Sequence, residues 1–332
     1  FFKQKTAYEM LRSLVGSEMC IRDRHLSLCA LDWWGMAFRS SVIDTITIIG
    51  RKALPPDGHV VHVAVHDPQS PLDHMVPQAD FFTSPRYTFN LFLTRERKSI
   101  LDQLGQCPQL GDYFEVHEGV HSGNIRRELF VDGHVDDTCH PLLLTGTEIA
   151  PYILRWAGKF IRLGALPERK TRDRYANLGN RQWHEREKLL VRRTGDYVLA
   201  AVDQEGYYAS NNYFLVFPRR PCSLDLDGLC ALLNSRFMTW YFRTIEPRRG
   251  RVFAELKIKH LSVFPLPPQV LAPDGCRVLN ELGAKRRAVV GKASDCSRSD
   301  MGGATMAARL DERINALVVD LFGVKDCSEV KG

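Results

Sequence analysis

The sequence predicts a mixed α/β protein, and two kinds of pattern predict it. Runs rich in β-branched and aromatic residues, which are typical of strands, occur at 40–50, 60–65, 160–163, 188–193, 197–202, 213–217 and 261–264. Longer runs with apolar residues at helical spacing occur at 226–242, 277–290 and 306–322. The chain has 332 residues, of which 44% are apolar, so it is long enough for two domains.

The composition excludes two broad classes. The apolar share is too high for a disordered chain, and no apolar stretch approaches the roughly 18 residues of a membrane-spanning helix. Nine cysteines, an odd number with no C-x-x-C pair, favour free thiols over a disulfide scaffold. We therefore expect a cytoplasmic protein that does not enter membranes.

Residues 1–24 do not read as a folded segment or as a targeting peptide. Their apolar runs are too short for a signal peptide, and three acidic residues argue against a transit peptide. The string resembles the conceptual translation of a sequencing-library adapter. We expect it to be an artefact without ordered structure, with the genuine sequence beginning near His25.

The N-terminal third is predicted to hold two strands and a short helix. The run at 40–50 reads as a buried strand, and a Pro-Pro-Asp-Gly turn separates it from the strand at 60–65. Two arrangements of the pair stay open: a plain hairpin, or the last edge of a larger α/β sheet. A further strand is predicted at 87–93 and a short helix at 98–104.

Glycines and prolines predict turns and element ends in the rest of the chain. Glycines 119 and 123 predict a tight backbone turn within 113–131. Prolines 265, 267 and 268 end the β-rich region. The Gly- and Ser-containing stretch 291–303 predicts a linker between the last two helices.

Positive charge is concentrated in one region. Residues 151–260 contain 21 Lys and Arg against 11 Asp and Glu, a net charge of +10, whereas the whole chain carries +6. Such a surplus is typical of a surface that binds a polyanion, although an ordinary solvated face would give the same count.

The residues do not predict a metal site. Four histidines and a cysteine fall close together in the chain, at His117, His121, His134, Cys139 and His140, but without the ligand spacing of a zinc site. We therefore expect no bound metal.

Catalytic motifs are likewise missing from the sequence. There is no nucleophile elbow, no phosphate-binding glycine loop and no Asn/Asp-Pro-Pro-aromatic motif. A magnesium-dependent nuclease built on Glu255 and Lys257 with Asp225 or Asp227 is a less favoured alternative. No catalytic residue is assigned.

A DNA-binding surface remains the best interpretation. Arg192 and Arg193 end a strand and should point to opposite faces, and 247–251 is a basic loop suited to phosphate. Asn211 lies beside tyrosines and would offer an amide to an adenine edge. The candidate residues are Gly123, Asn124, Lys188, Arg192, Arg193, Thr194, Asn211, Asn234, Ser235, Arg236, Arg248, Arg249, Arg251 and Lys257.

Five motifs in order carry a family resemblance. They are FEVHEGVHSGN (114–124), PLLLTGTEIAPY (141–152), KLLVRRTGD (188–196), ALLNS (231–235) and FAELK (253–257) followed by LSVFP. Over roughly residues 105–325 the chain resembles the C-terminal half of adenine-specific DNA methyltransferases of bacterial restriction-modification systems. These are the type IIG enzymes and relatives with a TaqI-like C-terminal specificity domain. The motifs contain Gly123, Asn124 and Lys257, which is why those three are candidates.

The resemblance implies a division of the chain. Residues 25–104 would be the remnant of a Rossmann-like methyltransferase sheet, 105–270 a mixed α/β target-recognition domain, and 271–332 a helical tail. Unpaired strands at 40–67 would then expose a sheet edge and favour aggregation.

The resemblance also implies transfer of a methyl group from S-adenosylmethionine to N6 of an adenine flipped out of duplex DNA. The cofactor and catalytic motifs of the family should lie upstream of residue 25. We therefore expect the chain to bind duplex DNA but not S-adenosylmethionine, and to be unable to methylate DNA. The alternative is a stand-alone specificity module without catalysis, and the sequence specifies neither the recognised DNA sequence nor the oligomeric state.

Overall fold

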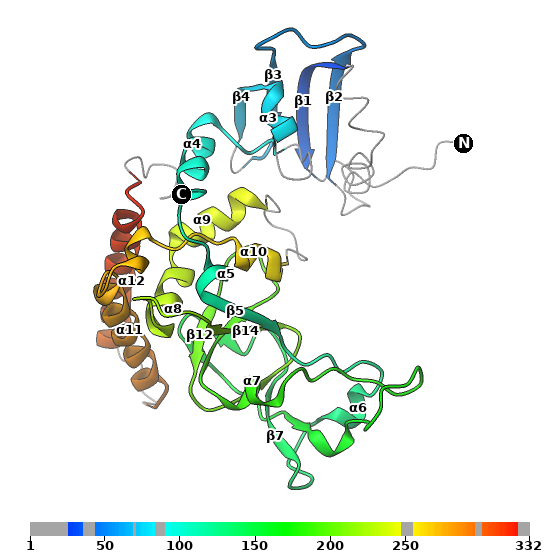
Figure 1. Ribbon diagram of the computed structural model, residues 1–332, viewed down its shortest axis with the longest axis vertical. Coiled ribbons are helices and arrows are strands. Elements are labelled where there is room, and N and C mark those ends of the chain that lie inside the picture. Colours follow the sequence, from blue (N-terminus) through cyan, green and yellow to red (C-terminus); the bar gives the residue numbers. More distant parts are fainter. Residues whose placement is uncertain are drawn as a thin grey trace. The chain divides into compact units, whose positions relative to one another are not determined.

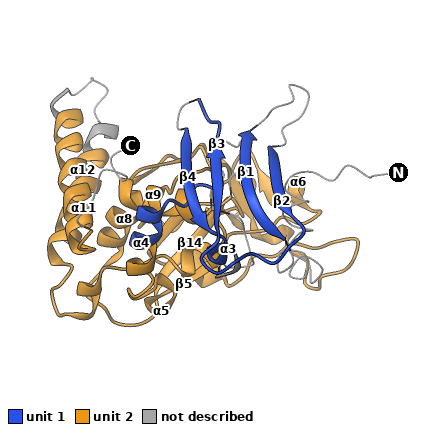
Figure 2. Cartoon of the chain, turned by 90° about the horizontal axis from the view of Figure 1, so that it is seen from above, with its two compact units in different colours: residues 1–100 blue, residues 101–332 orange. Residues whose placement is uncertain are grey.

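The computed structural model describes residues 26–35, 44–68, 71–83, 90–246, 255–295 and 301–324. The chain divides into two compact units, unit 1 (residues 1–100) and unit 2 (residues 101–332), which Figure 2 shows in different colours. Each unit has its own sheets and core, and each is described by itself below.

Unit 1 is built on a four-stranded sheet (Figure 1). Its strands are β1 (Ser27–Gly35), β2 (Thr45–Arg51), β3 (Val60–Val65) and β4 (Leu72–Pro77), in the order β2-β1-β3-β4. Only β1 and β3 run parallel. Leu31 of β1 and Val61 and Val63 of β3 are fully buried, and they pack with Phe81 of the short helix α3 (Gln78–Thr83).

Several expectations for unit 1 were wrong. The strands β2 and β3 do not form a hairpin, because β1 pairs with both and lies between them. β2 is an exposed edge strand rather than a buried one: among the described strands only β1 pairs with it, and Ile48 and Ile49 are 41% and 52% exposed.

Other predictions for the N-terminal third had mixed outcomes. The helix predicted at 98–104 is confirmed as α4 (Arg95–Leu104), which begins three residues earlier. Of the strand predicted at 87–93, residues 90–93 form a turn and the rest lies outside the described residues, as does the adapter-like segment 1–24.

Unit 2 contains two four-stranded sheets and a two-stranded hairpin. The first sheet is antiparallel throughout, with the order β12 (Ala200–Asp203), β11 (Lys188–Arg192), β14 (Tyr213–Pro218) and β5 (Phe114–Glu118). The second has the order β13 (Tyr208–Ala209), β7 (Cys139–Leu143), β10 (Phe160–Arg162) and β6 (Phe130–Val131). The hairpin joins β8 (Ile149–Ala150) to β9 (Ile153–Leu154).

Most of the predicted strands of unit 2 are confirmed. The runs at 160–163, 188–193 and 213–217 form β10, β11 and β14, and the run at 197–202 forms β12, which begins only at Ala200. The strand predicted at 261–264 is wrong, because that segment ends helix α10 (Ile258–Ser262). Leu261 and Phe264 are both fully buried, and their spacing of three suits a helical turn as well as a strand.

The helix predicted at 226–242 is two helices. α8 (Leu226–Asn234) and α9 (Arg236–Ile245) meet at Ser235, whose backbone is extended with ψ 152°. Its hydroxyl oxygen accepts the Met238 N–H at 3.2 Å, so Ser235 is the N-cap of α9. The apolar stripe continues through the break, which is why the sequence pattern does not reveal it.

The last two helices are longer than expected. α11 (Arg277–Asp295) and α12 (Met301–Leu321) both extend into the predicted linker. α11 packs closely on α8 of the same unit: a Cβ at Gly283 would come within 2.1 Å of the Asp227 carbonyl oxygen. The C-terminal helices are therefore part of the packing of unit 2.

Short elements complete unit 2. They are α5 (Leu110–Tyr113), α6 (Arg126–Leu129), α7 (Arg181–Glu185) and the 3-10 turns η2 (Leu163–Ala165) and η3 (Pro268–Leu271). In the described part of the chain six cysteines are free thiols. None of the described helices combines the length and apolar character needed to cross a bilayer.

Candidate nucleic-acid interface

The most conspicuous charged feature of unit 2 is the loop 168–175, Glu-Arg-Lys-Thr-Arg-Asp-Arg-Tyr. All eight residues are exposed, and four of them are cationic against two acidic ones. We call this segment the basic loop. Exposed Arg and Lys on a loop are suited to phosphate contact, because the backbone of a nucleic acid is reached from outside the duplex.

The basic loop is held at several points. Inside it, the Thr171 N–H donates to the Arg174 carbonyl oxygen at 3.0 Å, and the Arg174 N–H donates to the Thr171 hydroxyl at 3.0 Å. The Arg174 guanidinium donates to the Ala165 carbonyl oxygen at 3.1 Å. The Tyr175 N–H donates to Oδ1 of Asn124 at 2.9 Å. These bonds give a highly polar loop a defined conformation.

Helix α6 adds two more cations beside the loop. Arg126 and Arg127 are exposed, and Glu128 of the same helix lies 2.7 Å from the Arg174 guanidinium. This pair is exposed on both sides, so it contributes at most about 1 kcal/mol to stability, but it places α6 next to the loop. We define the basic surface as Arg126, Arg127, Arg169, Lys170, Arg172 and Arg174. Among the described residues only Arg174 of this set has a carboxylate partner.

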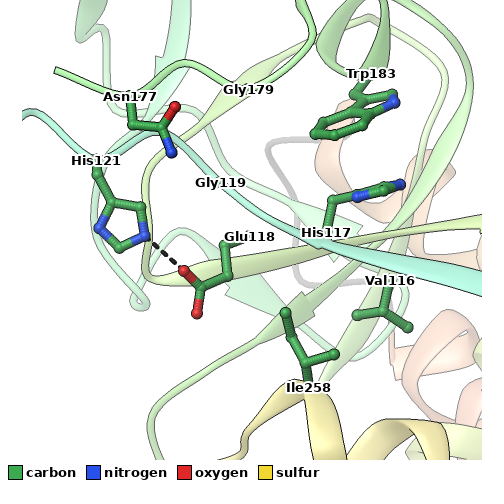
Figure 3. Close-up of a pocket in the computed structure, with 9 residues that line it drawn as sticks. All are labelled: Val116, His117, Glu118, Gly119, His121, Asn177, Gly179, Trp183 and Ile258. Atoms are coloured by element: carbon green, nitrogen blue, oxygen red, sulfur yellow. Dashed lines mark hydrogen bonds and ion pairs between the residues drawn. The ribbon is translucent and has the colours of Figure 1, made fainter. Parts of the chain in front are cut away.

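A pocket of about 260 Å³ lies where the chain leaves the basic loop (Figure 3). It is lined by Val116, His117, Glu118, Gly119, His121, Asn177, Gly179, Trp183 and Ile258. The backbones of His121 and Asn177 form an antiparallel bridge with hydrogen bonds of 2.9 and 2.8 Å, so their side chains share one face. The Lys170 ammonium group reaches Oδ1 of Asn177 at 3.2 Å and links the pocket to the loop.

Two polar residues of the pocket, Glu118 and His121, are already paired with each other. Nε2 of His121 lies 2.7 Å from Oε2 of Glu118, as Figure 3 shows. The other oxygen of Glu118 lies 3.4 Å from the Arg193 guanidinium, and the rings of His117 and Trp183 stack at 3.6 Å. The side chains of Glu118 and His121 are each 38% exposed, and the lining also includes the apolar Val116 and Ile258.

The structure corrects the expectation for Lys188. Its side chain is completely buried, with the ammonium group 2.5 Å from the Asp203 carboxylate and 2.5 Å from the His184 carbonyl oxygen. Burial lowers the pKa of Lys188 and raises that of Asp203. Lys188 therefore stabilises the first sheet of unit 2 and has no path to a DNA backbone.

The other candidates of the KLLVRRTGD motif lie at the surface, but they differ in whether their side chains are free to contact DNA. Arg193 is paired with Glu255 and Glu118, so its charge is already neutralised. The Arg192 guanidinium lies over the Tyr197 ring at 4.7 Å. Thr194 is exposed at the turn.

The candidates of the ALLNS motif have structural roles. The Asn234 amide accepts the Ala200 N–H at 3.0 Å and donates to the Ala200 carbonyl at 2.8 Å, so it holds α8 to β12. Ser235 is buried at the N-terminus of α9. Arg236 is exposed, and it forms a 2.6 Å ion pair with Glu312 of α12. The expected DNA contacts of Asn234 and Ser235 are not supported by these positions.

The remaining candidates fall into three groups. Gly123 and Asn124 are exposed and contact Tyr175 of the basic loop. Asn211 is partly exposed, and Lys257 is the N-cap residue of α10. Arg248, Arg249 and Arg251 lie outside the described residues.

The alternative catalytic groupings do not assemble in the described part of the chain. Asp225 accepts the Gly228 N–H as the N-cap of α8, Asp227 makes a two-bond ion pair with Arg287, and Glu255 pairs with Arg193. The described residues also bring no three His, Cys, Asp or Glu side chains together as a metal site.

The basic surface was missed by the reasoning from sequence. The charge surplus at 151–260 pointed to the right region, but the motifs drew attention to strands and helices. The run Arg-Lys-Thr-Arg-Asp-Arg at 169–174, with no apolar residue to bury, is the pattern that would have identified the exposed loop.

Comparisons with known proteins place this surface in context. Residues 141–266 match the TaqI-like C-terminal specificity domain. The resemblance to this family is thus confirmed over a segment that contains the basic loop, β11, β14 and α8. No curated protein matches the sequence.

Among solved structures, the fold of the chain is similar to that of one restriction-modification enzyme, and a second is a weaker match. The type IIL restriction-modification enzyme MmeI, solved in complex with DNA, is similar over 92% of this chain with a TM-score of 0.54 and 10% identity. The type IIG restriction endonuclease BpuSI is similar over 94% of the chain, with a TM-score of 0.40 and 12% identity. The chain spans 44% of the MmeI chain and 45% of the BpuSI chain.

Proposed function

We propose that unit 2 is the DNA target-recognition part of a restriction-modification enzyme and that its basic surface contacts the backbone of duplex DNA. The observation that carries this proposal is the basic loop: four cations on an exposed segment with a defined conformation, inside a segment that matches a specificity domain. The two arginines of α6 widen the same surface.

The charge arrangement supports DNA backbone contact more than protein contact. Most cations of the basic surface have no carboxylate partner among the described residues, so binding would replace counterions rather than break ion pairs. Arg193 differs from these cations, because two carboxylates already pair with it and DNA binding would have to break those ion pairs. The surface also adjoins a pocket with an amide, a carboxylate and an imidazole, which are groups able to contact base edges.

We further propose that the parent enzyme methylates adenine at N6 with S-adenosylmethionine and acts in the cytoplasm. This rests on the family resemblance alone. The sequence holds neither the glycine-rich cofactor motif nor the Asn/Asp-Pro-Pro-aromatic motif, so the residues present do not fit that cofactor. Methyl transfer would depend on residues other than these 332.

The test is salt-dependent binding of the full chain to labelled duplex DNA by fluorescence anisotropy. The affinity should fall steeply between roughly 50 and 200 mM salt. The double variant R169A/R172A should bind more weakly at every DNA sequence, and its log–log salt slope should be smaller by about 2, close to 0.9 for each lost phosphate contact.

A matched control is the double variant R219A/R220A. This variant also removes two exposed arginines from unit 2. They follow the end of β14 at which Pro218 pairs with Phe114, whereas the basic loop lies nearer the end at which Phe214 pairs with Glu118. This control should bind as the unchanged protein does. Salt-independent binding, or equal losses in the two double variants, would contradict the proposed surface.

A further inference from the structure

An exposed aromatic ring stands among the cations of the basic surface. Tyr175 is the last residue of the basic loop and is 47% exposed. Arg172 and Arg174 precede it in the loop, and Arg126 and Arg127 of α6 lie close by through the Arg174–Glu128 ion pair. An exposed ring in a cationic surface can stack on a nucleobase once the charges have drawn in the backbone.

The position of the Tyr175 ring is fixed by Gly123 and Asn124, which we call the seat of Tyr175. The Tyr175 N–H donates to Oδ1 of Asn124 at 2.9 Å, and the Asn124 N–H donates to the Tyr175 carbonyl oxygen at 3.3 Å. Gly123 adopts φ +53°, and a Cβ there would lie 2.0 Å from that carbonyl oxygen and 2.7 Å from Cδ2 of the ring. Only glycine permits this approach, so the backbone of Gly123 supports the Cδ2–Cε2 side of the ring.

Stacking requires a base whose face is accessible. Inside a regular duplex each base is covered above and below by its neighbours, so a side chain reaches a face only where a base is unpaired or unstacked. Resting on the DNA binding proposed above, we propose that Tyr175 is a stacking platform for an unstacked base beside the phosphates held by the basic surface.

This assignment also explains two of the residues named from sequence. Gly123 and Asn124 contact Tyr175 rather than DNA, and they act as positioning residues for the ring. A preorganised ring loses little conformational freedom on binding, which is an advantage for a contact made by a single side chain.

The experiment compares two short duplexes of the same sequence, one perfectly paired and one with a single bulged adenine. The full chain should bind the bulged duplex about fivefold more tightly or better, the lower end of what stacking one base on an aromatic side chain contributes. Y175F keeps the ring and should keep the preference. Y175L keeps an apolar contact with Gly123 but has no flat ring, and Y175A has neither, so both should bind the two duplexes equally.

The matched control is Y197A. Tyr197 is also an exposed tyrosine of unit 2, at 41%, but its ring is already covered by the Arg192 guanidinium. Y197A should keep the preference. Equal binding of both duplexes by the unchanged protein would overturn the platform while leaving the proposed DNA binding intact. A loss of preference in Y175F would overturn it as well, since it would assign the contact to the hydroxyl. Binding to neither duplex would refute the proposed function together with the platform.

Discussion

Replacing Lys188 by methionine separates a structural role from a DNA-binding one. Methionine matches the length of the lysine stem but removes the ammonium group that lies 2.5 Å from the Asp203 carboxylate. Asp203 would keep its hydrogen bonds from the N–H groups of Glu205, Gly206 and Tyr207, at 3.0, 3.1 and 3.0 Å. Its charge would be left without a cation in a site with no exposure to solvent.

The expected loss follows from the burial. Removing one partner of a buried ion pair typically costs about 3–5 kcal/mol, because the remaining charge stays desolvated. Burial already raises the pKa of Asp203, and loss of Lys188 raises it further. A carboxyl group whose folded pKa lies above its unfolded value favours the folded state at low pH. The K188M deficit should therefore be largest near neutral pH and should shrink as the pH falls and Asp203 takes up a proton.

Urea unfolding followed by tryptophan fluorescence measures this loss, and anisotropy titration measures DNA affinity under conditions where the variant stays folded. K188M should unfold at a lower urea concentration and bind duplex DNA as the unchanged protein does. The double variant K188M/D203N, which removes both charges, should recover part of the lost stability. A K188M protein of normal stability with tenfold weaker DNA binding would refute the buried position of Lys188.

Three further predictions concern single residues. Burial lowers the pKa of His184 to about 4, whereas in the unfolded chain it is about 6.5. Between these two pH values the unfolded chain binds a proton at His184 and the folded chain does not. The free energy of unfolding should fall by about 3 kcal/mol from pH 6.5 to 4, and H184Q should lack this part of the fall in urea titrations across that range. G123A should destabilise the seat of Tyr175 by about 1–3 kcal/mol and speed tryptic cleavage of the basic loop, whereas G133A, with open space around it, should not. N234A should cost about 1–3 kcal/mol in urea unfolding by leaving the Ala200 N–H without its partner, while the Ala200 carbonyl keeps the Tyr152 N–H, and DNA affinity should not change.

The sequence predicts the elements of unit 2 better than those of unit 1. The strands β11 and β14 are continuous apolar runs that are buried on both faces, and such runs are recognisable by themselves. The strand β1 escaped prediction because its Leu-Cys-Ala-Leu-Asp-Trp-Trp stretch follows the adapter-like segment and lacks β-branched residues. The break at Ser235 depends on one hydroxyl and leaves the apolar stripe unchanged.

The candidate site was predicted at the level of the region rather than the residue. The region 151–260, which has the surplus of positive charge, includes the basic loop. The sequence alone does not reveal whether the side chain of a Lys or Arg residue is exposed to solvent or paired with a carboxylate. Lys188 and Asp203 are fifteen residues apart in sequence, and only the pairing of β11 with β12 brings them together. Arg193 meets Glu118 in the same way, through strands that are distant in the chain.

The bridge between His121 and Asn177 lies at the C-terminal end of the stretch that contains the basic loop. The length and sequence of this stretch can therefore change without a change in the sheets of unit 2. The stretch that contains the basic loop starts after Ala165 of η2, whose carbonyl oxygen accepts a hydrogen bond from Arg174, and it ends at the bridge formed by Asn177, so the chain is held within unit 2 on both sides of the loop. Lengthening such a closed segment is thermodynamically cheap, since each doubling of a flexible loop costs only about 0.6 kcal/mol. Insertions and exchanges of residues between these two points should therefore leave the fold intact while changing the surface that is offered to DNA. A recognition module built in this way can acquire a new target without having to evolve a new core.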